Sequence, residues 1–123
     1  KSKIEKNESF QIWGTGKPLR EFLYVDDLSS AIDFIISNEV NNDLLNVGSG
    51  EEISIKALSE KIKKIIDFKG ELVFDNSKPD GNPRKLLDSN LINSLGWKSS
   101  INLDEGLELT YKWFVENIKN IRK

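Results

Sequence analysis

The sequence predicts an α/β (or α+β) fold in which short strands alternate with amphipathic helices, and three features support this prediction. Apolar residues recur at helical spacing in several segments. Short runs of β-branched and aromatic residues lie between these segments, and turns that contain glycine or proline separate the two kinds. The 123 residues, of which 37% are hydrophobic and 31% charged, suit one globular domain rather than a disordered chain.

The first part of the chain predicts two extended segments followed by a helix. Residues 10–13 end at Gly14 and predict a short strand, and residues 22–25 are predicted to be extended. Asp26 and Asp27 are predicted as the N-cap and first-turn acids of the helix that follows. The stripe of this helix that is expected to be buried consists of Leu28, Ala31, Ile32, Ile35 and Ile36.

The middle of the chain predicts strands at residues 44–47 and 71–74 with a helix between them. Ser54 is predicted to cap this helix, and Gly70 follows its end. The apolar face of the helix is expected to contain Ile55, Leu58, Ile62, Ile65 and Ile66.

The last part of the chain predicts a polar loop and two helices. The loop covers residues 75–85 and contains two prolines and a glycine. Asp88 is predicted to cap a short helix that Gly96 ends, and Asn102 is predicted to start the last helix. The apolar face of the last helix is expected to contain Leu103, Leu107, Tyr111, Phe114, Ile118 and Ile121.

Composition excludes several classes of function. The sequence contains no cysteine and no histidine, which rules out disulfides, Cys- or His-ligated metal sites and Ser-His-Asp catalysis, so we expect no metal site. A net charge of −2 and a pI near 5.3 argue against nucleic-acid binding. The sequence has no apolar run approaching the ~20 residues of a membrane span, and residues 1–10 lack the apolar core of a signal peptide. We therefore expect a cytoplasmic protein that binds no membrane.

Two glycine-rich turns fail to match the phosphate-binding motifs that they suggest. The turn Gly14-Thr15-Gly16-Lys17 lacks the earlier glycine of a P-loop, and Pro18 stands where that motif has Ser or Thr. Gly48-Ser49-Gly50 would need a third glycine at the position of Ile53 to bind a dinucleotide. Neither tyrosine is followed four residues later by lysine, so the Tyr-x-x-x-Lys pair that donates a proton to a carbonyl is also absent.

The remaining candidates for chemistry are an aromatic residue, several cations and an acid in the predicted loops. Trp13 stands at a strand end, where its indole could stack on a base or a ribose, and Arg20 could bind a phosphate with its guanidinium. Lys78 and Asp80 place a cation and an acid in one loop, a combination that suits the phosphates and the diol of a ribose diphosphate. Each residue also has a plainer interpretation: packing for Trp13, pairing with a neighbouring acid for Arg20 and solvation for the loop cations.

Three runs of residues resemble one known family. Residues 13–28 contain an Arg, then aromatic and apolar residues, then Val-Asp-Asp, and residues 46–50 read Asn-Val-Gly-Ser-Gly. Residues 74–88 contain the run Ser-Lys-Pro-Asp-Gly-Asn-Pro-Arg-Lys-Leu-Leu-Asp. On these runs the sequence resembles the extended short-chain dehydrogenase/reductase family, and the third run resembles its branch of GDP-sugar epimerase-reductases. The resemblance covers about residues 10–117.

The resemblance implies that residues 1–123 form a single domain, the C-terminal substrate-binding part of a larger NADP-dependent epimerase and oxidoreductase. In this family an N-terminal Rossmann domain binds NADP and supplies the catalytic residues, and that domain would lie outside this sequence. We therefore expect no catalytic residue in the chain, a GDP-sugar as substrate, and a homodimer for the whole enzyme.

The resemblance also implies roles for individual residues. Trp13 and Arg20 match family positions that contact the GDP moiety, with Arg20 at the diphosphate. Lys78 and Asp80 match the loop that reaches the diphosphate and the ribose, although related epimerases carry the acid one position away. The pair Arg84-Lys85 matches the motif, but no ligand contact can be assigned to it.

Alternatives remain open at this point. The same residues fit an enzyme that acts on a 6-deoxy-hexose or on a 6-deoxy-heptose carried by GDP, because none of them identifies the sugar. They also fit a non-catalytic binding domain in which the helix of residues 103–121 contacts a partner. In a chain without its N-terminal domain the stripe from Leu28 to Ile35 would lack its cover, so we expect self-association.

Overall fold

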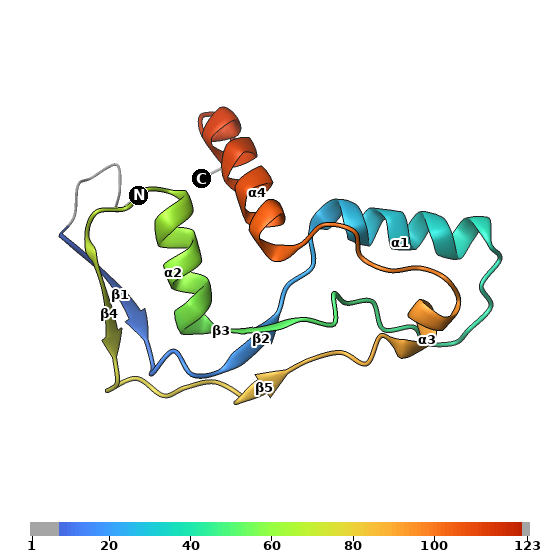
Figure 1. Cartoon of the computed structure of the whole chain (residues 1–123), viewed down its shortest axis with the longest axis horizontal. Helices are drawn as coiled ribbons and strands as arrows, with labels where there is room; N and C mark the ends of the chain where they lie inside the picture. Colours follow the sequence, from blue (N-terminus) through green and yellow to red (C-terminus); the bar gives the residue numbers. More distant parts are fainter. Residues whose placement is uncertain (1–7, 122–123) are drawn as a thin grey trace.

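A computed structural model describes residues 8–121 and confirms the mixed α/β class. One small sheet lies at one end of the molecule and a second lies along its length, and helices pack beside them (Figure 1). No helix of the described part is both long and apolar enough to cross a membrane.

The first sheet joins two segments that are about sixty residues apart in the sequence. Strand β1 (Ser9–Trp13) pairs in parallel with β4 (Glu71–Asp75), and Trp13 lies opposite Asp75. The amide of Gly14 continues the ladder by donating to the Asp75 carbonyl at 3.0 Å. Both strands were predicted from the sequence, and the end of β1 is thereby fixed beside the loop that follows β4.

The second sheet is built around β2 (Leu19–Glu21). Strand β3 (Glu52–Ser54) pairs antiparallel with one edge of β2, and β5 (Arg84–Lys85) pairs in parallel with the other. Since β1 and β2 follow each other closely, the turn of residues 14–18 connects the two sheets (Figure 1).

Two predicted strand positions are wrong. The extended segment predicted at 22–25 lies earlier, as β2, and Val25 already begins helix α1 (Val25–Ser37). The segment 44–47 pairs with no strand of the described residues. Its side chains Leu45 and Val47 instead pack against the buried core of Ala31, Ile92 and Trp97, so burial rather than a ladder explains its apolar sequence.

The predicted cap and buried stripe of α1 also need correction. The N-cap residue is Tyr24, whose side chain makes no capping hydrogen bond, and Asp26 and Asp27 lie in the first turn. Asp27 is only 2% exposed, and its carboxylate accepts hydrogen bonds from the Ser100 and Ile101 amides at 3.0 Å. Burial raises the pKa of Asp27, but these bonds and the one from the Ser100 hydroxyl outweigh it and hold the pKa below its usual value.

Only part of the α1 stripe is covered. Ala31 is fully buried and Ile35 is half-buried, whereas Leu28, Ile32 and Ile36 are exposed, the last of them to 71%. The helix rests on its Asp27 and Ala31 side, because the segment around Ser100 packs there. The remaining apolar residues face away from the described part of the chain.

The other helices begin largely where the sequence predicted. Ser54 Oγ caps α2 (Ile55–Ile65) by accepting from the Ala57 amide at 3.1 Å, and Asn102 Oδ1 caps α4 (Leu103–Asn117) by accepting from the Glu105 amide at 3.0 Å. The two helices lie side by side (Figure 1). Short helix α3 (Asn90–Ser94) has Ser89 rather than Asp88 at its N-cap position, although Asp88 Oδ1 accepts from the Asn90 amide at 3.0 Å.

The predicted apolar faces of α2 and α4 are only partly covered. No residue of α2 is fully buried, and Phe114 near the end of α4 is exposed. Helix α4 ends before the predicted Ile118 and Ile121, which are also exposed. Gly106 is the fully buried residue of α4, where a Cβ would lie 3.3 Å from the Tyr24 ring. This contact joins the start of α4 to the segment that enters α1.

Candidate functional site

The structure brings an exposed aromatic ring and a cation together at the end of β1. Trp13 is the last residue of β1, and its side chain is 71% exposed. Lys78 follows β4 in the loop of residues 76–83, and its Nζ lies 5.7 Å from the centre of the indole ring. The parallel pairing of β1 with β4 makes this contact possible across 65 positions of sequence. An open aromatic face beside an ammonium group can stack on a base while the cation binds a phosphate.

Arg20 lies in the middle of β2 and is half-buried. Its Nη1 donates to the neighbouring Leu19 carbonyl at 2.6 Å, and a Cβ on Gly81 would lie 3.3 Å from its Nη2. The guanidinium forms no ion pair with any carboxylate of residues 8–121. Its remaining N–H groups are therefore available to an anion that approaches the loop.

Glu21, the neighbouring acid that could have paired with Arg20, makes other contacts. The carboxylate of Glu21 accepts from the Gly50 amide at 2.7 Å and from the Leu87 amide at 3.1 Å. A Cβ on Gly48 would lie 2.4 Å from Glu21 Oε1, so this carboxylate fills the space beside the 48–50 turn. Glu21 thus joins β2 to the segment that precedes β3 and to the segment that follows β5. Its position in the sequence did not indicate this role.

Asp80 belongs to the same loop as Lys78, but its carboxylate is already engaged. Oδ2 accepts from the Thr15 hydroxyl at 2.6 Å, and Oδ1 accepts from the Thr15 amide at 2.8 Å. These two bonds, with the nearby charge of Lys17, hold the pKa of Asp80 below its usual value. Gly14 adopts a φ of +84°, and a Cβ there would lie 2.3 Å from Asp80 Oδ1, so this turn needs a glycine.

The next two cations of the motif differ in role. Arg84 donates to both carboxylate oxygens of Glu52 at 2.7 Å, so the ion pair links β5 to β3 across β2. Each partner stabilises the charge of the other, which lowers the pKa of Glu52 and raises that of Arg84. Lys85 is exposed. The structure therefore gives Arg84 a stabilising contact within the sheet.

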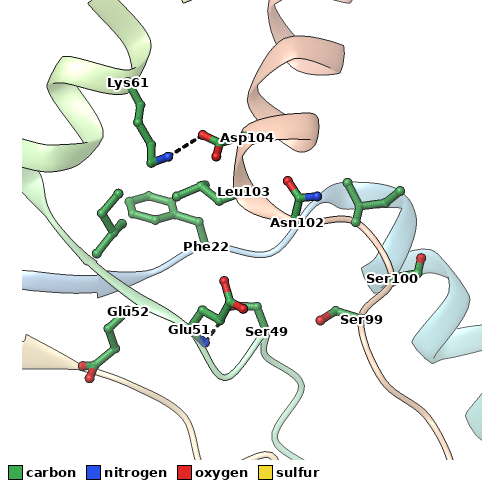
Figure 2. A pocket seen from close by; sticks show the side chains of 12 residues that line it. Phe22, Ser49, Glu51, Glu52, Lys61, Ser99, Ser100, Asn102, Leu103 and Asp104 are labelled. Carbon is green, nitrogen blue, oxygen red and sulfur yellow. Dashed lines mark hydrogen bonds and ion pairs between the residues drawn. The ribbon is translucent and has the colours of Figure 1, made fainter.

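A separate cavity of about 390 Å³ lies between the second sheet and the helices α2 and α4 (Figure 2). Phe22 and Glu51 line it, together with the ion pair between Lys61 and Asp104. None of the four residues predicted to bind a ligand lines this cavity. The candidate site is thus the surface formed by Trp13, Arg20 and the loop 76–83.

The chain is similar in sequence to known proteins. A model of the NAD dependent epimerase/dehydratase family matches residues 2–48. The chain is 53% identical over 112 residues to a probable GDP-L-fucose synthase 1 of Oryza sativa subsp. japonica. The aligned region covers 91% of this chain and 34% of that protein.

Solved structures show the same fold. A GDP-L-fucose synthetase from Naegleria fowleri bound to NADP superposes with a TM-score of 0.88 at 27% identity, over 99% of this chain and 39% of that one. A GDP-6-OMe-4-keto-L-xylo-heptose reductase from C. jejuni superposes with a TM-score of 0.81 at 37% identity, over 89% of this chain and 34% of that one. The chain spans about a third of the length of the relatives that it matches. The chain is thus similar to the NAD dependent epimerase/dehydratase family over residues 2–48, and to GDP-L-fucose synthases over nine-tenths or more of its length.

Proposed function

We propose that this chain is the substrate-binding part of an NADP-dependent epimerase-reductase of the GDP-L-fucose synthase type, and that it binds the GDP moiety of a GDP-sugar. The observation that carries the proposal is the exposed Trp13 indole with Lys78 beside its face and the unpaired Arg20 guanidinium near the same loop. In the whole protein the reaction would convert GDP-4-keto-6-deoxy-D-mannose to GDP-L-fucose.

Each proposed contact follows from the chemistry of the group. The indole face of Trp13 offers a flat apolar surface on which a guanine base can stack. Arg20 presents a planar set of donors that fits two oxygens of a diphosphate, and Lys78 adds a second positive charge. We propose that Trp13, Arg20 and Lys78 contact the substrate, and that Asp80, the fourth residue predicted from the sequence, belongs to the same site.

Binding at the diphosphate would contribute to the reaction without touching the reacting carbons. The free energy gained at the nucleotide end can hold the sugar in the geometry that the chemical step needs. This chain would therefore act by positioning the substrate, while the catalytic groups would come from the part of the relatives that the chain does not span.

NADP does not fit the residues of this chain. The Gly48–Gly50 turn leads into β3 rather than into a helix, and Ile53 stands where a dinucleotide-binding turn has its third glycine. In the structure of residues 8–121, this turn is thus not followed directly by the helix N-terminus that holds a pyrophosphate. We propose that NADP binds to the remainder of the whole protein.

One of the comparisons raises a second substrate. The C. jejuni heptose reductase is 37% identical to this chain, which is above the 27% of the N. fowleri synthetase and below the 53% of the Oryza sativa protein. The two neighbours share a GDP-linked sugar by name and differ in the sugar itself. The proposed contacts of Trp13 and Arg20 with GDP would serve either sugar.

The proposal is tested by titrating the chain with GDP and with UDP while recording NMR spectra. We expect GDP to shift the Trp13 indole N–H signal and the amides of residues 76–83, and UDP to act more weakly because its base is smaller. Trp13→Ala should abolish most of the response, whereas Trp113→Ala, which removes another exposed tryptophan on α4, should leave it intact. No response to GDP would contradict binding by these residues and would favour a non-catalytic interaction domain.

A further inference from the structure

The loop 76–83, which carries Lys78 and Asp80, is held at both of its ends. At its start, the Asp75 carbonyl accepts from the amides of Gly14 at 3.0 Å and Lys78 at 3.1 Å. At its end, the Pro83 carbonyl accepts from the Leu19 amide at 2.8 Å. Between these points, the Ser77 amide and hydroxyl donate to Asp75 Oδ1 at the end of β4. The two bonds from Thr15 to Asp80 join the loop to a more distant part of residues 8–121.

The Thr15 hydroxyl has a defined direction in this arrangement. Its oxygen accepts from the Lys17 amide at 3.2 Å, and its proton is donated to Asp80 Oδ2 at 2.6 Å. Together with its own amide, Thr15 therefore offers two donors that match the two oxygens of one carboxylate. This Thr15–Asp80 clasp joins residues that are 65 positions apart.

We propose that the Thr15–Asp80 clasp positions the nucleotide-binding groups and that Asp80 acts as a positioning residue through Thr15, rather than as the group that binds the ribose. The inference rests on the proposed function, since it concerns the same site. Asp80 lies between Lys78, whose ammonium is beside Trp13, and Gly81, which lies against the Arg20 guanidinium. Holding Asp80 in place thus also holds Lys78 and Gly81 in place relative to β1 and β2.

The clasp also explains how an acid can stand in a site for a diphosphate. A free carboxylate near Lys17, Lys78 and Arg20 would compete with the phosphates for these cations. Both oxygens of Asp80 instead accept hydrogen bonds from Thr15, so the carboxylate is already partnered and held in place. A ribose diol would have to share or displace these bonds, whereas a positioning role uses them as they are.

The experiment compares two ligands, GDP and 2′,3′-dideoxy-GDP, across four chains: wild type, Thr15→Val, Thr15→Ser and Asp80→Ala. Thr15→Val keeps the size of the side chain and removes the hydroxyl, and we expect it to weaken GDP binding on the order of tenfold. Thr15→Ser keeps the hydroxyl and should restore binding to within about twofold of wild type. Under the proposal, Asp80→Ala weakens both ligands by the same factor, because the ribose hydroxyls are not its partners.

Opposite results would overturn the proposal. If Asp80 binds the ribose, its replacement weakens GDP but not the dideoxy ligand, and Thr15→Val has little effect on either. Unchanged amide signals of α2 in each variant will show that the fold persists, so that a loss of affinity reports on the site.

The outcome also separates this inference from the proposed function. If wild type does not bind GDP, the proposed function fails, and the clasp is then tested in the ligand-free chain. There, Thr15→Val should move the Trp13 indole N–H signal because Lys78 leaves the ring, while Thr15→Ser should not. If wild type binds GDP and Thr15→Val binds it equally well, the clasp is wrong and the proposed function stands.

Discussion

At the end of the molecule that holds Trp13 and Lys78, exposed segments far apart in the sequence are joined mainly by hydrogen bonds. The end that holds α1 and α3 is joined by a small apolar core and by the buried hydrogen bonds of Asp27. The first end contains the parallel β1–β4 pair and the Thr15–Asp80 clasp. The second contains buried Ala31, Ile92 and Trp97 and leaves several apolar side chains of α1 exposed. Directional bonds fix the position of ligand-binding groups, while apolar packing mainly supplies stability. Changes at the first end should therefore alter binding, and changes at the second should alter stability or association.

The largest effect is expected for Arg20→Ala at the binding end. Arg20 has no carboxylate partner in the described part of the chain, so its removal leaves no buried acid unpaired. Loss of a charge-assisted contact to a diphosphate should cost about 2 to 4 kcal/mol of binding free energy. Calorimetric titration with GDP measures this loss, and urea unfolding should show stability close to wild type.

A matched control for Arg20 is Lys98→Ala, which removes an exposed positive charge that makes none of the proposed contacts. It should lower GDP affinity only slightly, through the change in net charge. Equal affinities of Arg20→Ala and wild type would remove Arg20 from the site.

Asp27→Ala should produce the opposite pattern at the core end, with lost stability and retained GDP contacts. Asp27 is buried and accepts from the amides of Ser100 and Ile101, which would be left without a partner. We expect a loss of about 2 to 3 kcal/mol in the free energy of unfolding, measured by urea titration. The neighbouring Asp26→Ala removes an exposed acid from the same helical turn and should cost less than about 1 kcal/mol. Similar losses for the two variants would show that the Asp27 bonds do not stabilise the core end.

The pKa of Asp27 predicts how pH acts on this contribution. Because the folded chain lowers this pKa from 3.8, the unfolded chain binds the proton more readily, and acid favours unfolding. The stabilisation is fully present above the unfolded-state pKa and is lost as the pH falls through the lower folded-state value. Wild type should thus lose more stability than Asp27→Ala when urea titrations are repeated in this acidic range.

Local signals in the sequence were sufficient to predict the starts of the long helices α2 and α4 and the strands β1 and β4. Ser54 and Asn102 cap their helices through bonds to amides three residues away, and such requirements can be seen in sequence. Strand β2 could not be predicted in the same way. Its residues Arg20 and Glu21 have no strand-like pattern, and the strand exists because β3 and β5 pair with it from later parts of the chain.

The site was predictable to a similar extent. The chemistry of Trp13, Arg20 and Lys78 marked them as candidates, and the β1–β4 pairing brings the first and the last of these together. Thr15 was missed, because its partner Asp80 is 65 positions away and the turn around it was judged only as a failed P-loop. The two glycines that flank Thr15 were the available signal, since both adopt positive φ values in a turn of defined shape.

The smallest effect is expected for the exposed face of α1, where a substitution should change the association of the chain but not its GDP binding. Leu28, Ile32 and Ile36 form an apolar patch on one helix, and such a patch favours weak association between copies of the chain. Sedimentation equilibrium should show an average mass that rises with concentration, and Ile32→Glu should reduce this rise without changing GDP binding. Ile62→Glu places the same charge on the exposed part of α2 and should leave the association unchanged. A wild-type chain that stays monomeric at high concentration would mean that the patch is too small to drive association, and the core end would then differ from the binding end in stability alone.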